Sequence, residues 1–167
     1  IDKYNTDILQ TFALWNKLFR LDLIKQYHLN FKSVSYSEDG IFVMDYVLHC
    51  TNITGLDQAL IQYRRFNESI GGSITASVSE SKIRDYLTAH EMILTCAKES
   101  FLRDFPEYTT IEEAIADNED INDYLNTIIH KELLILLNRF YAKFWTLDSS
   151  TAQFLLTQIN SKLELLN

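Results

Sequence analysis

Residues 120–144, DINDYLNTIIHKELLILLNRFYAKF, decide the fold class of this chain. Their apolar side chains recur at spacings of three or four residues, the pattern of one buried helix face. The stripe comprises Ile121, Leu125, Ile129, Leu133, Leu136, Phe140 and Phe144. Residues 133–137 are apolar on every side, so we expect this helix to be the central one.

The flanking sequence predicts further helices. No glycine occurs from Ser73 onward and Pro106 is the only proline, which favours long helices with short connections. Residues 77–80 and 110–113 match the capping box that starts a helix. The helix before Pro106 would bury Ile83, Leu87, His90, Leu94, Phe101 and Phe105. We expect Asp120, and Ser149 or Ser150, to cap the last two helices.

The first eighty residues carry different signals. Residues 6–29 predict a long helix with Ile8, Phe12, Trp15 and Phe19 on its buried face. Asp39-Gly40 between the runs 31–37 and 41–50 indicates a β-hairpin. Residues 56–66 are consistent with a short helix, and the alternation in residues 73–79 with a third strand.

The fold class predicted from these patterns is predominantly α, within an α+β arrangement. We expect a bundle of about five to six helices with a small antiparallel hairpin or three-stranded sheet near residues 31–79. The alternative is an all-α fold in which residues 41–50 form a helix, and propensity does not decide between them. Because no repeat or linker interrupts the sequence, we expect residues 1–167 to form a single globular domain.

Composition excludes several classes of protein. Hydrophobic residues make up 47% of the chain, which argues against disorder. No apolar run approaches the roughly 20 residues that span a bilayer. Cys50 and Cys96 are too few for a disulfide scaffold, although one disulfide stays open. We therefore expect a cytoplasmic protein, with its oligomeric state left open.

The net charge of −8 is concentrated in one segment. Residues 104–123 contain eight acids and no Lys or Arg, whereas the other 147 residues carry 15 acids and 15 bases. This acidic balance argues against nucleic acid and anionic membranes as partners. Acids are also favoured at helix starts, so part of the cluster would have a local structural role. The remainder predicts a surface that attracts a basic protein.

Arg84 and His90 are separated by five residues in the sequence RDYLTAH. This spacing resembles the Arg-x(4–6)-His motif of the HEPN ribonucleases, a helical family. The resemblance covers seven residues and implies a metal-independent ribonuclease in which Arg84 and His90 act on the scissile phosphate, usually across a dimer. His90 also falls on the apolar stripe, where the alternative is a packed, hydrogen-bonded histidine.

The sequence predicts no metal and no cofactor. The His and Cys spacings of structural zinc sites are absent. Residues 117–123 are rich in oxygen ligands but lack the glycine and the distal glutamate of a calcium loop. No phosphate-binding glycine motif occurs either.

The leading functional hypothesis is a non-enzymatic protein-interaction domain whose acidic surface binds a basic protein partner. Its most concrete form is an inhibitor or immunity-type protein that neutralises a toxin or nuclease. The predicted contact residues are Glu107, Tyr108, Glu112, Glu113, Asp117, Glu119, Asp120, Asp123 and Tyr124. One alternative is the ribonuclease with Arg84 and His90. The other is a subunit of a larger assembly, joined through a hairpin face of Phe42, Met44, Tyr46 and Leu48.

Overall fold

The computed structural model describes residues 2–62 and 77–165, which contain six α-helices and no strand. In chain order the elements are the 3₁₀ turn η1 (Thr6–Gln10), α1 (Leu21–Gln26), α2 (Glu38–Leu48), α3 (Glu80–Asp104), α4 (Ile111–Asp117), α5 (Glu119–Ile135), the π-helical turn η3 (Leu136–Phe140), the 3₁₀ turn η4 (Tyr141–Thr146) and α6 (Ser149–Leu165). The prediction of a predominantly helical protein is confirmed. The described residues agree with its all-α form.

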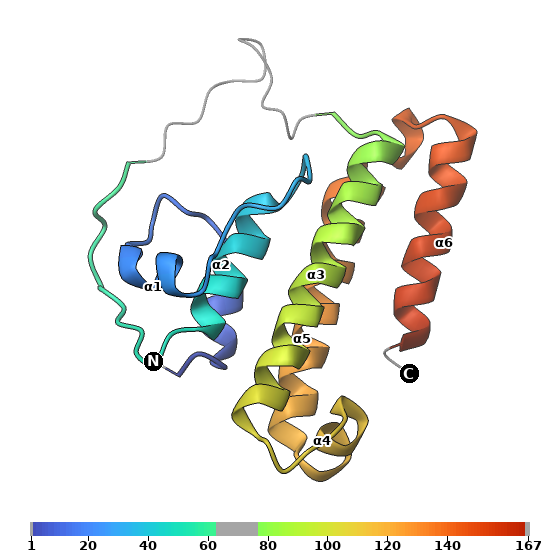
Figure 1. Cartoon of the computed structure of the whole chain (residues 1–167). Helices are drawn as coiled ribbons and strands as arrows, with labels where there is room; N and C mark the ends of the chain where they lie inside the picture. The colour runs from blue at the N-terminus through green and yellow to red at the C-terminus, as the bar shows by residue number, and fades with distance from the viewer. Residues whose placement is uncertain (1, 63–76, 166–167) are drawn as a thin grey trace.

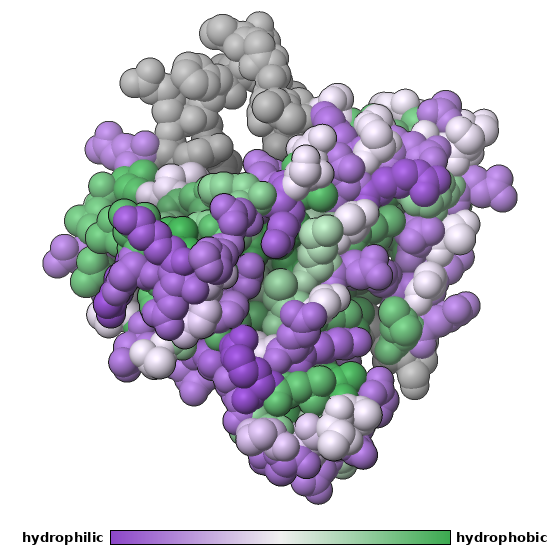
Figure 2. Space-filling model, in the orientation of Figure 1, coloured by the Kyte–Doolittle hydropathy of each residue, from purple (hydrophilic) through white to green (hydrophobic). Residues whose placement is uncertain are grey.

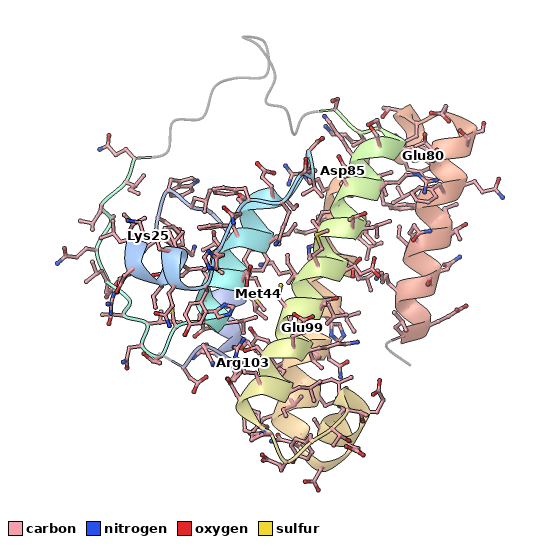
Figure 3. All side chains as sticks on the ribbon, in the orientation of Figure 1. Lys25, Met44, Glu80, Asp85, Glu99 and Arg103 are labelled. Atoms are coloured by element: carbon pink, nitrogen blue, oxygen red, sulfur yellow. The ribbon has the colours of Figure 1, made fainter. Side chains whose placement is uncertain are left out.

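Helix α3 lies at the centre of the arrangement (Figure 1). It packs against α2 on one side and against α5 and α6 on the other, while α4 closes the end where the chain turns from α3 into α5. Met44 points from α2 towards α3, where its Sδ lies 3.9 Å from the hydroxyl of Tyr124 on α5 (Figure 3). The N-terminal turn η1 contacts α5, so the start of the chain reaches the same end as α4.

The predicted hairpin at residues 31–50 is wrong, because residues 38–48 form helix α2. Eight of the eleven residues in α2 are buried. One side of the helix meets α3, and the other meets the N-terminal segment, whose Phe19 and Phe31 rings contact Phe42. A helix buried on all sides has a continuous apolar sequence, which periodicity cannot distinguish from a buried strand.

Asp39 and Gly40, which suggested a turn, lie in the first turn of α2. Asp39 complements the positive end of the helix dipole there. A Cβ atom at position 40 would lie 3.1 Å from Phe12 Cδ2, so glycine lets the Phe12 ring approach the helix backbone. The same burial corrects the proposed assembly interface. Its four residues, Phe42, Met44, Tyr46 and Leu48, are at most 7% exposed.

The long N-terminal helix predicted for residues 6–29 is also wrong. Asn5 accepts a hydrogen bond from the amide of Asp7 and starts η1, but Thr11 is already extended. Trp15, predicted to be buried, is 53% exposed. Figure 2 shows hydrophobic side chains gathered over this N-terminal part of the molecule. Phe12, Phe19 and Phe31 each pack against α2, so contacts with that helix position them, and they do not form one face of a helix of their own.

The C-terminal helices agree with the sequence more closely. The capping box of residues 110–113 is confirmed, and α3 ends at Asp104, just before Pro106. Ser79, Asn118 and Asp148 accept hydrogen bonds at the starts of α3, α5 and α6. Each lies within two positions of the cap that we predicted, so the local signal identified the helix start but not its residue.

The predicted buried face of α3 is confirmed at Ile83, His90 and Phe101, but not at its other positions. On α3 the fully buried line runs through Tyr86, Ala89, Ile93 and Ala97, while Leu87 and Leu94 lie at its edge. On α5 the predicted stripe is largely confirmed, but Leu134 is 56% exposed. Helix α5 is therefore buried on one side only, and α3 is the central helix.

Two further predictions meet the limits of the described residues. Residues 73–76 of the suggested third strand and residues 63–66 of the suggested helix lie outside them. Residues 56–62 and 77–79, which are described, form neither helix nor strand. Within the described ranges no helix has the length and apolar character needed to cross a bilayer.

Candidate functional site

The acidic residues of segment 104–123 gather at one end of the molecule. This acidic end consists of the α3–α4 connection, α4 and the first turns of α5. Its exposed carboxylates belong to Glu107, Glu112, Glu113, Asp117, Glu119, Asp120 and Asp123. The structure thus brings together these seven of the nine residues predicted to contact a partner, and an eighth, Tyr108, lies half-buried beside them.

Part of this charge stabilises the local backbone. Glu113 Oε2 accepts hydrogen bonds from the Thr109 hydroxyl and from the amides of Thr109 and Thr110. These bonds, led by the one from the hydroxyl, hold the pKa of Glu113 below its ordinary value. Asp117 accepts a 2.8 Å hydrogen bond from the hydroxyl of Tyr108, which raises the pKa of that tyrosine.

Asp104 is fully engaged in the fold. It pairs with Lys3 and Arg103 and accepts a 2.6 Å hydrogen bond from the Tyr4 hydroxyl. Burial alone would raise its pKa, but the bonds from Lys3 and Tyr4 lower it overall. Arg103 also reaches from α3 to the carbonyl of Leu48 at the end of α2, at 2.7 Å (Figure 3). Asp104 therefore belongs to the contact that holds the N-terminus against α3.

Five carboxylates of the acidic end have neither a cation nor a hydrogen bond to compensate them within the described residues. Among residues 2–62 and 77–165, no Lys, Arg or His forms an ion pair with Glu107, Glu112, Glu119, Asp120 or Asp123. Like charges gathered this closely repel one another and create a negative potential extending into solvent. A basic group approaching this end is therefore attracted to it.

A groove of about 730 Å³ opens beside these acids, between η1, the end of α3 and the start of α5. Four aromatic rings line it. Tyr4 stacks on Phe101 with ring centroids 4.2 Å apart, and Tyr124 meets both edge-on, at 5.6 and 5.5 Å. Phe105 lies 6.4 Å from Tyr4. Because Phe101 and Tyr124 are almost fully buried, they form the floor of the groove.

The edge of the groove is acidic. Asp120 and Asp123 of α5 line it together with Asp2 and Asp7 of the N-terminal segment, and all four are exposed. Asp2 and Asp7 were missed by sequence reasoning, because more than a hundred residues separate them from α5. The stacking of Tyr4 on Phe101 and the ion pair of Lys3 with Asp104 bring them to this end.

Tyr124 does not lie on the surface where the sequence placed it. It is 2% exposed, and burial raises its pKa well above the ordinary range. Tyr124 lies on the same buried face of α5 as Ile121 and Leu125, so the helical spacing of the sequence indicated a core residue. The surface open to a partner therefore excludes its hydroxyl, which faces Met44.

Arg84 and His90 lie on different faces of α3, because six residues turn a helix by about 240° beyond one full turn. Arg84 is exposed, pairs with Glu80 at 2.6 Å and lies 4.1 Å over the ring of Phe154. His90 is 3% exposed, with its ring 4.4 Å from that of Tyr86. The two side chains therefore do not converge on a common point.

The imidazole of His90 is held neutral. Burial, aided by the positive charges of Lys131 and Lys162, lowers its pKa to about 3. Its Nδ1 has no hydrogen-bond partner in the described part of the chain. His90 is thus packed in the core, as predicted by the alternative to a catalytic role. Among the described residues its Nδ1 lacks the hydrogen bond that usually accompanies burial.

No group of three or more His, Cys, Asp or Glu side chains within the described ranges is arranged to hold a metal ion. Cys50 and Cys96 are both free thiols, so the disulfide left open by the sequence is not formed.

Comparison of the chain with protein-family models, with curated proteins and with solved structures found no match.

Proposed function

We propose that this protein is a non-enzymatic interaction domain that binds a basic protein through its acidic end. The observation that carries the proposal is the set of five exposed carboxylates that have neither a cation partner nor a hydrogen bond among the described residues. Their mutual repulsion costs stability, and a basic partner would relieve it.

The location of the charge favours a specific binding surface over the alternative that the acids only make the protein acidic in general. Glu113 and Asp117 stabilise the helix start and the α4 loop through hydrogen bonds, whereas Glu107, Glu112 and Glu119 accept none from the described part of the chain. Glu112 and Glu119 still complement the dipoles of α4 and α5 from their first turns, but their carboxylates stay exposed and open to a partner. The three acids belong to an end where α3, α4 and α5 pack together, and an exposed acidic surface of this kind suits electrostatic steering of a partner.

The most concrete form of this function is an inhibitor or immunity-type protein. Its carboxylates would occupy the positions that phosphates occupy on a nuclease or another basic toxin. We place this activity in the cytoplasm, which the free thiols of Cys50 and Cys96 support. The ribonuclease alternative is not advanced, because His90 is buried and Arg84 is paired with Glu80.

The test measures the binding of a fluorescent octalysine peptide by anisotropy, at low and at high salt. The triple variant Glu107→Gln/Glu112→Gln/Glu119→Gln should weaken binding roughly tenfold at low salt, with a smaller loss at high salt because salt screens exposed charges.

The matched control is Asp57→Asn/Glu99→Gln/Glu164→Gln, which removes three exposed acids elsewhere on the surface. It changes the net charge by the same amount, so it should weaken binding only slightly. Equal losses in the two variants would mean that octalysine responds to net charge alone, and the proposed surface would be wrong.

A further inference from the structure

We propose that the groove between η1, the end of α3 and the start of α5 receives a single lysine or arginine side chain of the partner. This inference rests on the proposed function above and assigns the place where that partner is anchored. The remaining exposed acids would then steer the partner, while the groove would hold it.

The charge of the groove selects a cation. Asp2, Asp7, Asp120 and Asp123 all border it, and no Lys, Arg or His is found among the described residues that line it. A neutral side chain entering the groove would leave the negative charge of the four carboxylates unbalanced. A positive group would be attracted by all four at once.

The aromatic rings select a cation carried on an apolar stem. Lysine and arginine bury their methylene chains along apolar surface and keep the charged head among polar groups. In this groove the stem would lie along the half-buried rings of Tyr4 and Phe105, and the head would reach the carboxylates at the edge. A bare metal ion would gain nothing from the rings, and the acids are not arranged to ligate one.

Lys3 shows within this chain the chemistry that we assign to the groove. Its Nζ pairs with Asp104 and lies 5.3 Å from the centroid of the Tyr4 ring. An ammonium is thus already held between a carboxylate and an aromatic face, on the same tyrosine that lines the groove.

The size of the groove is compatible with this occupant. A volume of about 730 Å³ is larger than one side chain requires and falls within the range of ligand pockets in general. The groove can therefore admit the side chain together with the adjoining main chain of a partner's loop or terminus.

The test compares two double variants that remove the same charge. Asp7→Asn/Asp123→Asn alters the groove, and Glu112→Gln/Glu119→Gln alters the acidic end outside it. All four side chains are exposed, so both variants should fold. With octalysine as the probe, we expect roughly a tenfold loss of affinity for the groove variant and about a threefold loss for the other.

A second measurement reports the position of the probe. In an NMR titration with octalysine, the ring signals of Tyr4 and Phe105 should shift more than those of Tyr108, which lies at the acidic end outside the groove. If octalysine binds but the two variants weaken equally and the Tyr4 signals do not move, the groove proposal is overturned while the proposed function stands. If wild-type protein does not bind octalysine, the proposed function fails and this inference fails with it.

Discussion

The N-terminal residues 2–62 and the C-terminal residues 77–165 acquire their structures in different ways. The C-terminal helices α3 and α5 are long, and they and the short α4 begin at polar caps, so each contains determinants of its own. In the N-terminal region only α2 exceeds two turns, and the chain around it follows aromatic contacts. Tyr4 packs on Phe101, and Phe19 on Phe42.

This difference shows that a helix can be specified either locally or by its surroundings. Helix α2 belongs to the second kind, because it is enclosed by the N-terminal segment and by α3. Its apolar residues would have suited a strand as well. The tertiary contacts that bury both of its sides favour the helix.

The largest expected effect comes from truncating the core of α2. Leu48→Ala should lower the free energy of unfolding by about 3 kcal/mol, since Leu48 is 1% exposed and its removal leaves a cavity. Leu18→Ala in the same N-terminal region should change it by less than about 0.5 kcal/mol, since Leu18 is 98% exposed. Urea unfolding of both variants measures the difference. Similar values would show that α2 does not pack into the core with α3 and α5 as described.

The next effect concerns the buried histidine of the C-terminal region. The pKa of His90 is about 3 in the folded protein, against an ordinary value of 6.5, so the unfolded chain takes up a proton first as the pH falls. The stability contributed by neutral His90 is complete above pH 6.5 and is lost towards pH 3. Between pH 7 and pH 5 the wild-type protein should lose about 2 kcal/mol from this group.

His90→Leu isolates that contribution from the other titrating groups. The variant should be about as stable as wild type at pH 7, because His90 Nδ1 forms no hydrogen bond in the described structure. Its unfolding free energy should fall less between pH 7 and pH 5. A pH dependence unchanged by the substitution would mean that His90 is accessible to protons in the folded state, which would revive the ribonuclease alternative.

The smallest effect tests why glycine occupies position 40. Gly40→Ala should destabilise the protein by about 1 kcal/mol, because the new Cβ would lie 3.1 Å from Phe12 Cδ2. In a Phe12→Ala background the same change should become neutral or stabilising, since alanine is the better helix former. Thermal unfolding of the four proteins gives the coupling. An equal cost in both backgrounds would indicate backbone strain, as in the β-turn that the sequence suggested.

The candidate site was predictable only in part. The acidic end could be identified from residues 104–123. A run of acids without bases, in loops and at helix starts, must lie on the surface of the protein. Asp2 and Asp7 could not be assigned to it, since no feature of the sequence around them indicates that they lie beside α5. Tyr124 was assigned to the surface by its acidic neighbours, although its position on the α5 stripe indicated the core.

Those same limits apply to the fold. The end of α3 at Pro106 and the capping box of residues 110–113 depend on groups a few residues apart, and local sequence determines them. The prediction that residues 1–167 form one domain stays a prediction. The helical state of α2, the path of the N-terminal segment and the groove depend on contacts between residues far apart in the chain. Such contacts release free energy only when distant surfaces pack together, so only the tertiary structure decides them.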